Sequence, residues 1–269
     1  MHAQTALTGP RAWAGPPTRS SAAQLVSLTS RHTPAVWFGL LSDVHGNLAG
    51  LRAVAAALQR EGPLDAVVVA GDHVGAGPRP REVWEELQGL GWTLVRGNDD
   101  EELATAHPAQ DDVPPTHRRA WWAFHAWTRA RLAAATLAAL GALPFEARLA
   151  TPAGDLLVVH SSPRSVYDKA GGPHNSAAEA IAAYAGTGAG AIAFGLYHVS
   201  FVRPMPFALL VNVASVGSPV DRRPLAAYTA LTARPDGWVV EQRRVPYSAE
   251  EERRIAAAVG MPRWGPDVS

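Results

Sequence analysis

The sequence predicts an α/β fold in which a largely parallel sheet is layered by helices. Short apolar runs alternate with segments of helical periodicity, and short loops join them, which is typical of parallel sheets. The apolar run 35–41 is the clearest, because it ends abruptly in Asp43, His45, Gly46 and Asn47. Ligands of open α/β sheets bind at the carboxyl ends of strands, so the same pattern predicts where a functional site lies.

Composition limits both the fold and the chemistry. The chain has 269 residues, of which 47% are apolar and 18% charged, and this is enough for one large core. The formal net charge is zero, so we expect no nucleic-acid surface. The absence of cysteine excludes disulfides and Cys nucleophiles, and leaves oxygen ligands and His for any metal. No apolar run approaches the roughly 20 residues of a membrane span, and we expect a cytoplasmic protein.

The N-terminal segment 1–34 differs from the rest of the chain. It contains three arginines, no acidic residue and neither helical nor strand periodicity, so we expect a weakly structured extension. A targeting peptide is the alternative, because such peptides lack acids and contain Arg and Ser, but the apolar run 25–28 is too short for a signal sequence. We predict one domain over 35–262 and a C-terminal tail at 263–269.

The first part of the domain alternates strand and helix. The predicted elements are strands at 35–41, 66–70 and 92–95 and helices at 48–59 and 80–90. Pro80 lies in the first turn of the second helix and Gly91 follows its last turn, which are the expected start and stop signals.

A Pro- and Asp-rich break at 107–115 precedes a long helical stretch, predicted over 116–140. This stretch is rich in large aromatic residues, which we expect to pack against a sheet or cover a cleft, with a base-stacking platform as the alternative: Trp121, Trp122, Phe124 and Trp127. His117 and His125 show no partner pattern, so we interpret them as structural or exposed.

Strands return in the second half of the domain. The predicted strands are 145–149, 155–160, 191–194, 207–212, 225–231 and 238–244, with helices at 176–184 and 249–259. Pro235, Asp236 and Gly237 predict a hairpin turn between the last two strands.

Polar residues follow five of these strands. Asp43 and His45 are two residues apart, and on an extended backbone both side chains leave the same side, which is half of a divalent-metal site. The other strand ends offer further oxygen or nitrogen ligands, namely Asp72, Asn98, His160 and His198. A single such residue is usually a cap or turn residue. Five strand ends together favour a metal centre, in which Asp72 is placed to bridge two ions about 3.5–4 Å apart, the arrangement for phosphoester hydrolysis.

The order of the segments adds a resemblance. Six segments form the pattern: Leu41-Ser42-Asp43-Val44-His45-Gly46-Asn47, Gly71-Asp72-His73-Val74-Gly75-Ala76-Gly77-Pro78, Arg96-Gly97-Asn98-Asp99-Asp100, His160-Ser161-Ser162-Pro163-Arg164, Gly195-Leu196-Tyr197-His198 and Asn212-Val213-Ala214-Ser215-Val216-Gly217-Ser218-Pro219. From about Phe38 to Pro262 the chain resembles the calcineurin-like metallophosphoesterases, and among them the small bacterial phosphodiesterases and diadenosine-tetraphosphatase-like proteins.

The resemblance implies a fold, a cofactor and a reaction. The fold would be a four-layer α/β/β/α sandwich of two mixed sheets flanked by helices. The cofactor would be one or two divalent transition-metal ions (Mn, Fe, Zn or Ni), and a metal-bound hydroxide would hydrolyse a small phosphodiester, nucleotide or activated phosphomonoester. The partner would be this small phosphorylated substrate, and a homo-oligomer is left open.

The resemblance also assigns residues. The first ion would be bound by Asp43, His45 and His198, with Asp72 bridging, and the second by Asn98 and His160. Asp72, Asn98 and Asp99 would be the catalytic residues, and Asn98 would also contact substrate. Arg164 would bind the phosphate through its guanidinium, unless it only forms a surface salt bridge.

Two departures from the family pattern reduce the expected activity. Leu196 stands where the family has a histidine ligand of the second metal. Asp99 stands where the family has the histidine that stabilises the transition state or protonates the leaving group, and an ionised Asp cannot easily donate a proton, although it can ligate a metal. His73 either replaces a lost imidazole or, as the neighbour of Asp72, points to the other face. The alternative function is therefore a weak or inactive family member that binds metal and a phosphorylated ligand.

Overall fold

The structure is a computed structural model that describes residues 35–106 and 118–262. They belong to one compact unit spanning Thr33–Ser269. The predicted extension 1–34, the break at 107–115, His117 and the tail 263–269 lie outside the described residues, so the proposed domain boundaries stay a prediction. Among the described helices, none is both long and apolar enough to span a membrane.

The first sheet contains the predicted N-terminal strands and the C-terminal hairpin. Its strand order is β10-β9-β1-β2-β3, with bounds β1 Val36–Leu41, β2 Ala66–Ala70, β3 Thr93–Val95, β9 Leu225–Arg234 and β10 Gly237–Pro246. The neighbours β1, β2 and β3 are parallel, whereas β9 is antiparallel to both β1 and β10. The sheet is therefore mixed, and the predicted turn at 235–237 joins β9 to β10.

The second sheet is also mixed, and one of its strands was not predicted. Its order is β4-β5-β6-β8-β7, with bounds β4 Glu146–Leu149, β5 Leu156–Val159, β6 Ala191–Phe194, β8 Leu209–Val213 and β7 Ser200–Pro204. β5, β6 and β8 are parallel, and the antiparallel strands β4 and β7 form the edges. Sequence patterns missed β7 because it is a half-exposed edge strand that contains Arg203 and ends in Pro204.

Seven helices lie in the described residues, and three of them, α3, α4 and α5, differ from expectation. They are α1 Leu48–Glu61, α2 Pro80–Leu90, α3 Asn98–Thr105, α4 Arg118–Arg129, α5 Ala134–Gly141, α6 Ala177–Tyr184 and α7 Ala249–Ala258. The prediction of one helix over 116–140 is wrong, because the chain turns after α4 and Ala133 is extended, with φ −67° and ψ 151°. Helix α3 was not predicted, although its first turn contains Asp99, Asp100 and Glu101, which favour a helix N-terminus.

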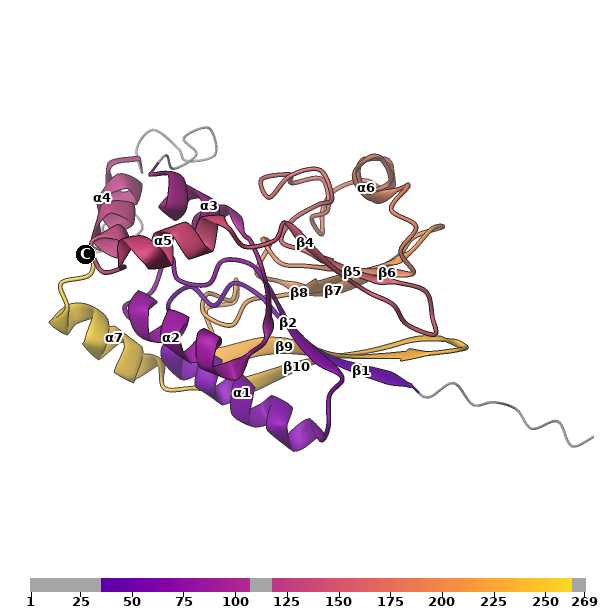
Figure 1. The fold of residues 1–269 in the computed structure, drawn as a ribbon, viewed down its shortest axis with the longest axis horizontal. Coiled ribbons are helices and arrows are strands. Elements are labelled where there is room, and N and C mark those ends of the chain that lie inside the picture. Colours follow the sequence, from indigo (N-terminus) through magenta and orange to yellow (C-terminus); the bar gives the residue numbers. More distant parts are fainter. Residues whose placement is uncertain (1–34, 107–117, 263–269) are drawn as a thin grey trace, which may run out of the picture. The chain divides into compact units, whose positions relative to one another are not determined.

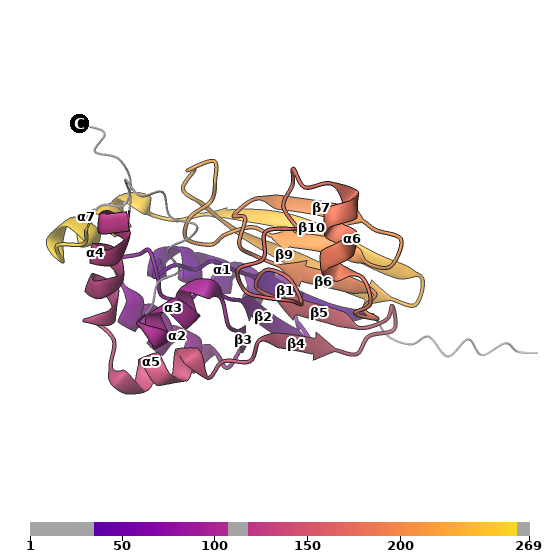
Figure 2. The same ribbon diagram turned by 90° about the horizontal axis from the view of Figure 1, so that it is seen from above.

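The strands divide the core into layers, because alternate residues of a strand face opposite sides. In β5, Leu156 and Val158 pack between the two sheets, whereas Leu157 and Val159 pack on the outer face with residues of α6. Leu41 and Val69 of the first sheet pack with α1 and α2 on the opposite outer face. Figures 1 and 2 show α1 and α2 on one side of the paired sheets and α6 on the other. The four-layer α/β/β/α sandwich of two mixed sheets is confirmed.

Candidate metal centre

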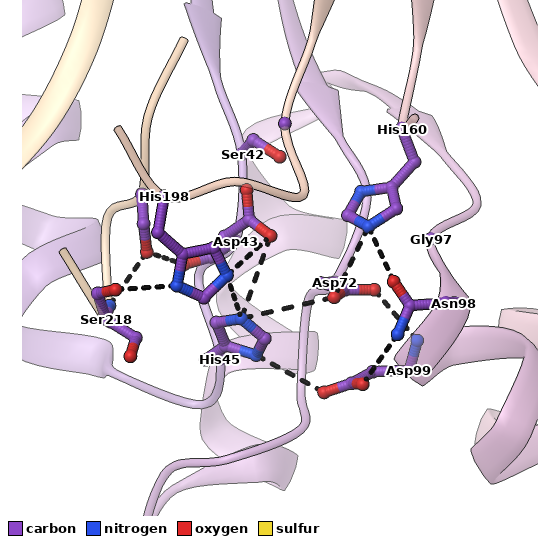
Figure 3. A network of polar contacts seen from close by, with 12 residues as sticks. Ser42, Asp43, His45, Asp72, Gly97, Asn98, Asp99, His160, His198 and Ser218 are labelled. Carbon is purple, nitrogen blue, oxygen red and sulfur yellow. Dashed lines mark hydrogen bonds and ion pairs between the residues drawn. The ribbon is translucent and has the colours of Figure 1, made fainter. Parts of the chain in front are cut away.

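The strand-end residues meet at one place. Figure 3 shows Asp43, His45, Asp72, Asn98, Asp99, His160 and His198 pointing toward one another. They come from the segments after β1, β2, β5 and β6 and from the first turn of α3. All six predicted ligands are thus in this cluster, and their binding of metal stays a prediction.

The reason why Asp43 and His45 converge differs from the one inferred from their spacing. Both residues have left-handed backbone conformations, with φ of 54° and 49°, so the backbone between them is not extended. Their N–H groups donate to the carbonyl oxygens of Gly71 and Asp72, both at 3.0 Å, which fixes the first loop against the second. Asp72 and His198 also have positive φ, at 56° and 55°. Such conformations persist only where surrounding contacts enforce them, and they cluster at functional sites.

Three of the side chains fit a metal ion by distance. His45 Nε2 lies 3.1 Å from His198 Nε2, and Asp43 Oδ1 lies 3.1 Å from His198 Nε2 and 3.7 Å from His45 Nε2. Ligand atoms about 2.0–2.1 Å from a tetrahedral ion are about 3.3 Å apart, so the three atoms match the edges of a coordination tetrahedron. Both carboxylate oxygens of Asp43 are buried and accept no hydrogen bond from a described residue. A cation is the partner that these oxygens fit.

The imidazoles are oriented for metal binding as well. The Nδ1 atoms of His198 and His160 lie 2.6 Å and 2.8 Å from the carbonyl oxygens of Ser218 and Ala70, to which only an N–H can donate. His45 Nδ1 lies 3.4 Å from Asp99 Oδ2. In His198 and His160, therefore, the proton belongs on Nδ1, and Nε2 presents its lone pair to the cluster.

A second set of ligands shares Asp72. Asp72 Oδ2 lies 3.4 Å from His160 Nε2 and 4.0 Å from His45 Nε2, whereas Oδ1 accepts the Asp99 N–H at 2.9 Å. Oδ2 is thus directed between the two sets, as a bridging ligand must be. Asn98 Oδ1 lies 2.8 Å from His160 Nε2 and completes the second set. Leu196 lines the same cavity but offers no ligand atom.

The charges explain why the site favours a cation. Burial, together with the charges of Asp99, Asp43 and Asp100, raises the pKa of Asp72 well above its usual value. Burial would also raise the pKa of Asp43, but the ion pair with His198 outweighs burial and lowers it. Burial lowers the pKa of His160, which keeps this imidazole neutral and able to ligate. A divalent cation would replace the proton on His198 as the positive charge beside Asp43.

Asp100 joins the second and third loops. Its buried carboxylate accepts the N–H groups of Asp72, His73 and Gly97 at 2.9–3.1 Å, and His73 Nδ1 lies 2.8 Å away. His73 therefore faces Asp100 and does not replace a missing imidazole at the metal centre. The close approach of the loops requires glycine at 97, because a Cβ there would overlap Asp72 Oδ1.

A cavity of about 490 Å³ opens beside the ligands. Its wall includes Trp121 and Phe124 of α4 together with Tyr167 and Tyr197, and Lys169 is also in the lining. Of the four aromatic residues noted in the 116–140 stretch, Trp121 and Phe124 line this cavity, whereas Trp122 is 40% exposed. Sequence patterns did not single out Tyr167, Lys169 or Tyr197 as site residues. The one available signal was that Lys169 is the only lysine in the sequence.

Arg164 lies outside this lining. Its Nε donates to Asp168 Oδ2 at 2.7 Å, and its side chain is 53% exposed. The contact with Asp168 is a surface salt bridge, one of the two roles considered for Arg164 from the sequence. Binding of phosphate by Arg164 stays a prediction.

His125 is buried, which agrees with the structural one of the two interpretations made from the sequence. It is 4% exposed, and its Nε2 lies 3.3 Å from Glu102 Oε2. Asp99, Glu102 and His125 together form a further group of possible metal ligands next to the main cluster. The signal in the sequence was the spacing of Asp99 and Glu102, which becomes informative only once α3 is known to be a helix.

The fold and the paired ligand sets define the class of the protein, the metallophosphoesterase α/β sandwich. The family model described as the calcineurin-like phosphoesterase superfamily domain matches residues 37–234, and the chain therefore belongs to this superfamily. None of the curated proteins matches the chain.

Solved structures give the same class. The chain is similar to a metallophosphoesterase from Sphaerobacter thermophilus, with 27% identity, a TM-score of 0.65, and coverage of 86% of this chain and 96% of that one. It is also similar to the hypothetical protein PH1004 from Pyrococcus horikoshii OT3, with 20% identity, a TM-score of 0.73, and coverage of 85% and 95%. A putative diadenosine tetraphosphatase shares the fold at 18% identity and a TM-score of 0.50, with coverage of 80% and 95%.

Replacing Asp100 by Asn should destabilise the protein. The variant loses a buried charge and places an amide N–H₂ among four donors, so we expect the free energy of unfolding to fall by about 3 kcal/mol or more. Urea denaturation followed by circular dichroism measures this change. The matched control is Asp236→Asn in the β9–β10 turn, for which we expect a change within about 0.5 kcal/mol. Equal stabilities of the two variants would contradict the role of Asp100.

Proposed function

We propose that the protein is a divalent-metal-dependent phosphoesterase that hydrolyses a small phosphodiester, nucleotide or activated phosphomonoester. The observation that supports this most directly is the position of Asp72 Oδ2 between two sets of ligands, one with His45 and one with His160. Mn²⁺, Fe²⁺, Zn²⁺ or Ni²⁺ suits these oxygen and imidazole ligands. When bound, such ions polarise a phosphoryl oxygen and make water nucleophilic at neutral pH.

The residues of the chain orient the parts of the reaction. Asn98 Nδ2 donates to Asp99 Oδ1 at 3.1 Å, which turns Asn98 Oδ1 toward His160 and leaves the amide beside the substrate cavity. Asp99 orients His45 through Nδ1, and carboxylates in this position raise the basicity of a ligating imidazole. We assign Asp72 and Asn98 to the catalytic machinery and Asp99 to the positioning of His45.

Asp99 also limits which substrates react fast. Burial would raise the pKa of Asp99, but its contact with His45 and the charge of His125 lower it, so the carboxyl is ionised and has no proton to give. A general acid usually contributes about 10²–10⁴-fold, which matters most for poor leaving groups such as alkoxides. We therefore propose substrates with good leaving groups, anhydrides and activated esters, bound between the aromatic walls of the cavity.

The second candidate function is binding with little turnover, and Leu196 is the observation in its favour. The second set of ligands contains Asp72, Asn98 and His160 but no further imidazole from position 196. A member with only the first ion would bind metal and a phosphorylated ligand without fast hydrolysis. A cytoplasmic location and a homo-oligomer stay predictions.

Asp72→Ala tests the main proposal. Loss of the bridging oxygen should lower kcat/KM for bis(para-nitrophenyl) phosphate with Mn²⁺ by about 100-fold or more. Even the replacement of a residue that only supports a metal ligand lowers metal affinity or activity by about 10–100-fold. Hydrolysis is followed by absorbance, and bound metal by elemental analysis of the same samples. Asp236→Ala in the exposed turn is the control and should keep the wild-type rate. If Asp72→Ala keeps the wild-type rate as well, the assigned centre is wrong.

Leu196→His separates the two candidate functions. Leu196 has φ of 67°, a conformation that histidine adopts more readily than leucine, so the backbone accepts the change. We expect Mn²⁺ affinity of the second site and kcat each to rise about tenfold, by the magnitude typical of a restored metal-site interaction. Calorimetric titration and steady-state kinetics measure the two effects, with Leu196→Met as the apolar control. An unchanged affinity would show that position 196 does not face the second ion.

A further inference from the structure

The connection between β5 and α6 contributes both a predicted metal ligand and a basic residue to the cavity. It begins with His160, directly after β5, and continues to Lys169, whose side chain is exposed. Among the described residues that line the cavity of about 490 Å³, Lys169 is the only Lys or Arg. The cavity therefore combines the candidate metal ligands with one permanently positive side chain that cannot itself bind a metal cation.

Asp168 fixes the conformation of this loop next to Lys169. Its Oδ2 accepts hydrogen bonds from Ser162 Oγ and Arg164 Nε, both at 2.7 Å, and its Oδ1 accepts the Ala170 N–H at 3.0 Å. Burial would raise the pKa of Asp168, but these hydrogen bonds lower it, so the carboxylate stays ionised. The residues on either side of Asp168 are thus presented by an ordered backbone, which reduces the entropy that binding a ligand costs.

A further contact ties the same loop to a second ligand segment. The Gly171 N–H donates to the hydroxyl of Tyr197 at 3.1 Å, and Tyr197 directly precedes His198. Position 171 requires glycine, because a Cβ there would overlap the hydroxyl of Tyr184. The backbone around Lys169 is therefore fixed relative to the segment that supplies His198.

The remaining wall of the cavity is largely aromatic. Trp121 and Phe124 are stacked, with ring centroids 6.4 Å apart and an angle of 25° between the ring planes. Tyr167, from the same loop as Lys169, also lines the cavity and is half-buried. Aromatic side chains of this kind bind flat rings by stacking, whatever the substituents of the ring.

The charge of Lys169 has a use that the metal ligands do not cover. In the proposed function, the ligand sets around Asp72 receive the phosphoryl group that is hydrolysed. Lysine binds phosphate as a point charge, and an exposed ammonium pairs with an anion at a smaller desolvation cost than a buried one. A second anionic group of the same substrate is the partner that this side chain fits.

We propose that Lys169 determines substrate specificity by binding a second anionic group next to the phosphorus that is attacked. The inference rests on the proposed function and narrows its substrate class, because phosphoanhydrides contain such a group and activated esters do not. An aromatic ring of the same substrate would stack on the wall that contains Trp121 and Phe124. Asp168 is then a positioning residue, which acts through the loop that carries Lys169.

Calorimetric titration of the Mn²⁺-loaded full chain with AMP and with α,β-methylene-ADP tests this role. The two probes share a ring and a first phosphate, and the second probe adds one anionic group through a bridge that resists hydrolysis. We expect Lys169→Met to lower the ratio of the two affinities about tenfold, the size of one charged contact, and Lys169→Arg to keep the wild-type ratio. The control is Arg234→Met, which removes an exposed cation from the end of β9. An unchanged ratio in Lys169→Met, or an equal fall in Arg234→Met, would overturn the proposal.

Steady-state kinetics separates this inference from the proposed function. We expect Lys169→Met to lose about tenfold more in kcat/KM for ADP, followed by phosphate release, than for bis(para-nitrophenyl) phosphate. An equal loss for both substrates would overturn the specificity role of Lys169 and leave the proposed function standing. If the wild type hydrolyses neither substrate while Lys169→Met still lowers the affinity ratio, the proposed function fails and the binding role of Lys169 is supported.

Discussion

The arrangement of the loops around the candidate site depends on the hydrogen bonds that the carboxylate of Asp100 accepts. This carboxylate is fully buried and accepts hydrogen bonds from the backbone of the second loop, from the Gly97 N–H before α3, and from His73. These contacts set the distance between Asp72 and the first turn of α3, which contains Asn98 and Asp99. Hydrogen bonds to an ionised group are about twice as strong as neutral ones. The single carboxylate of Asp100 therefore holds the second loop against the start of α3.

The same region concentrates negative charge, which is costly without a cation. Asp43, Asp72, Asp99 and Asp100 are all at most 3% exposed. His73 pairs with Asp100 and His198 pairs with Asp43, whereas burial, followed by the charges of Asp99, Asp43 and Asp100, raises the pKa of Asp72.

The departures from the family pattern have different physical consequences. Leu196 offers no ligand atom and places an apolar side chain in the cavity lining, so its expected effect is a lower affinity for a second ion. Asp99 replaces a proton donor by a carboxylate that faces His45 and lies beside Glu102 and His125. The change at 99 thus adds negative charge, whereas the change at 196 removes a ligand atom.

The sequence by itself determined the α/β class and most strands and helices, because apolar periodicity is a local property. It also supplied the six predicted ligands, whose binding of metal stays a prediction. It did not reveal the edge strand β7, helix α3 or the break between α4 and α5, where local patterns are weak. Only the tertiary structure decided the directions of side chains at positive φ, the pairing of His73 with Asp100, and the meeting of His125 with Glu102. These features depend on contacts between residues far apart in the chain, and no spacing rule for a single strand or helix describes them.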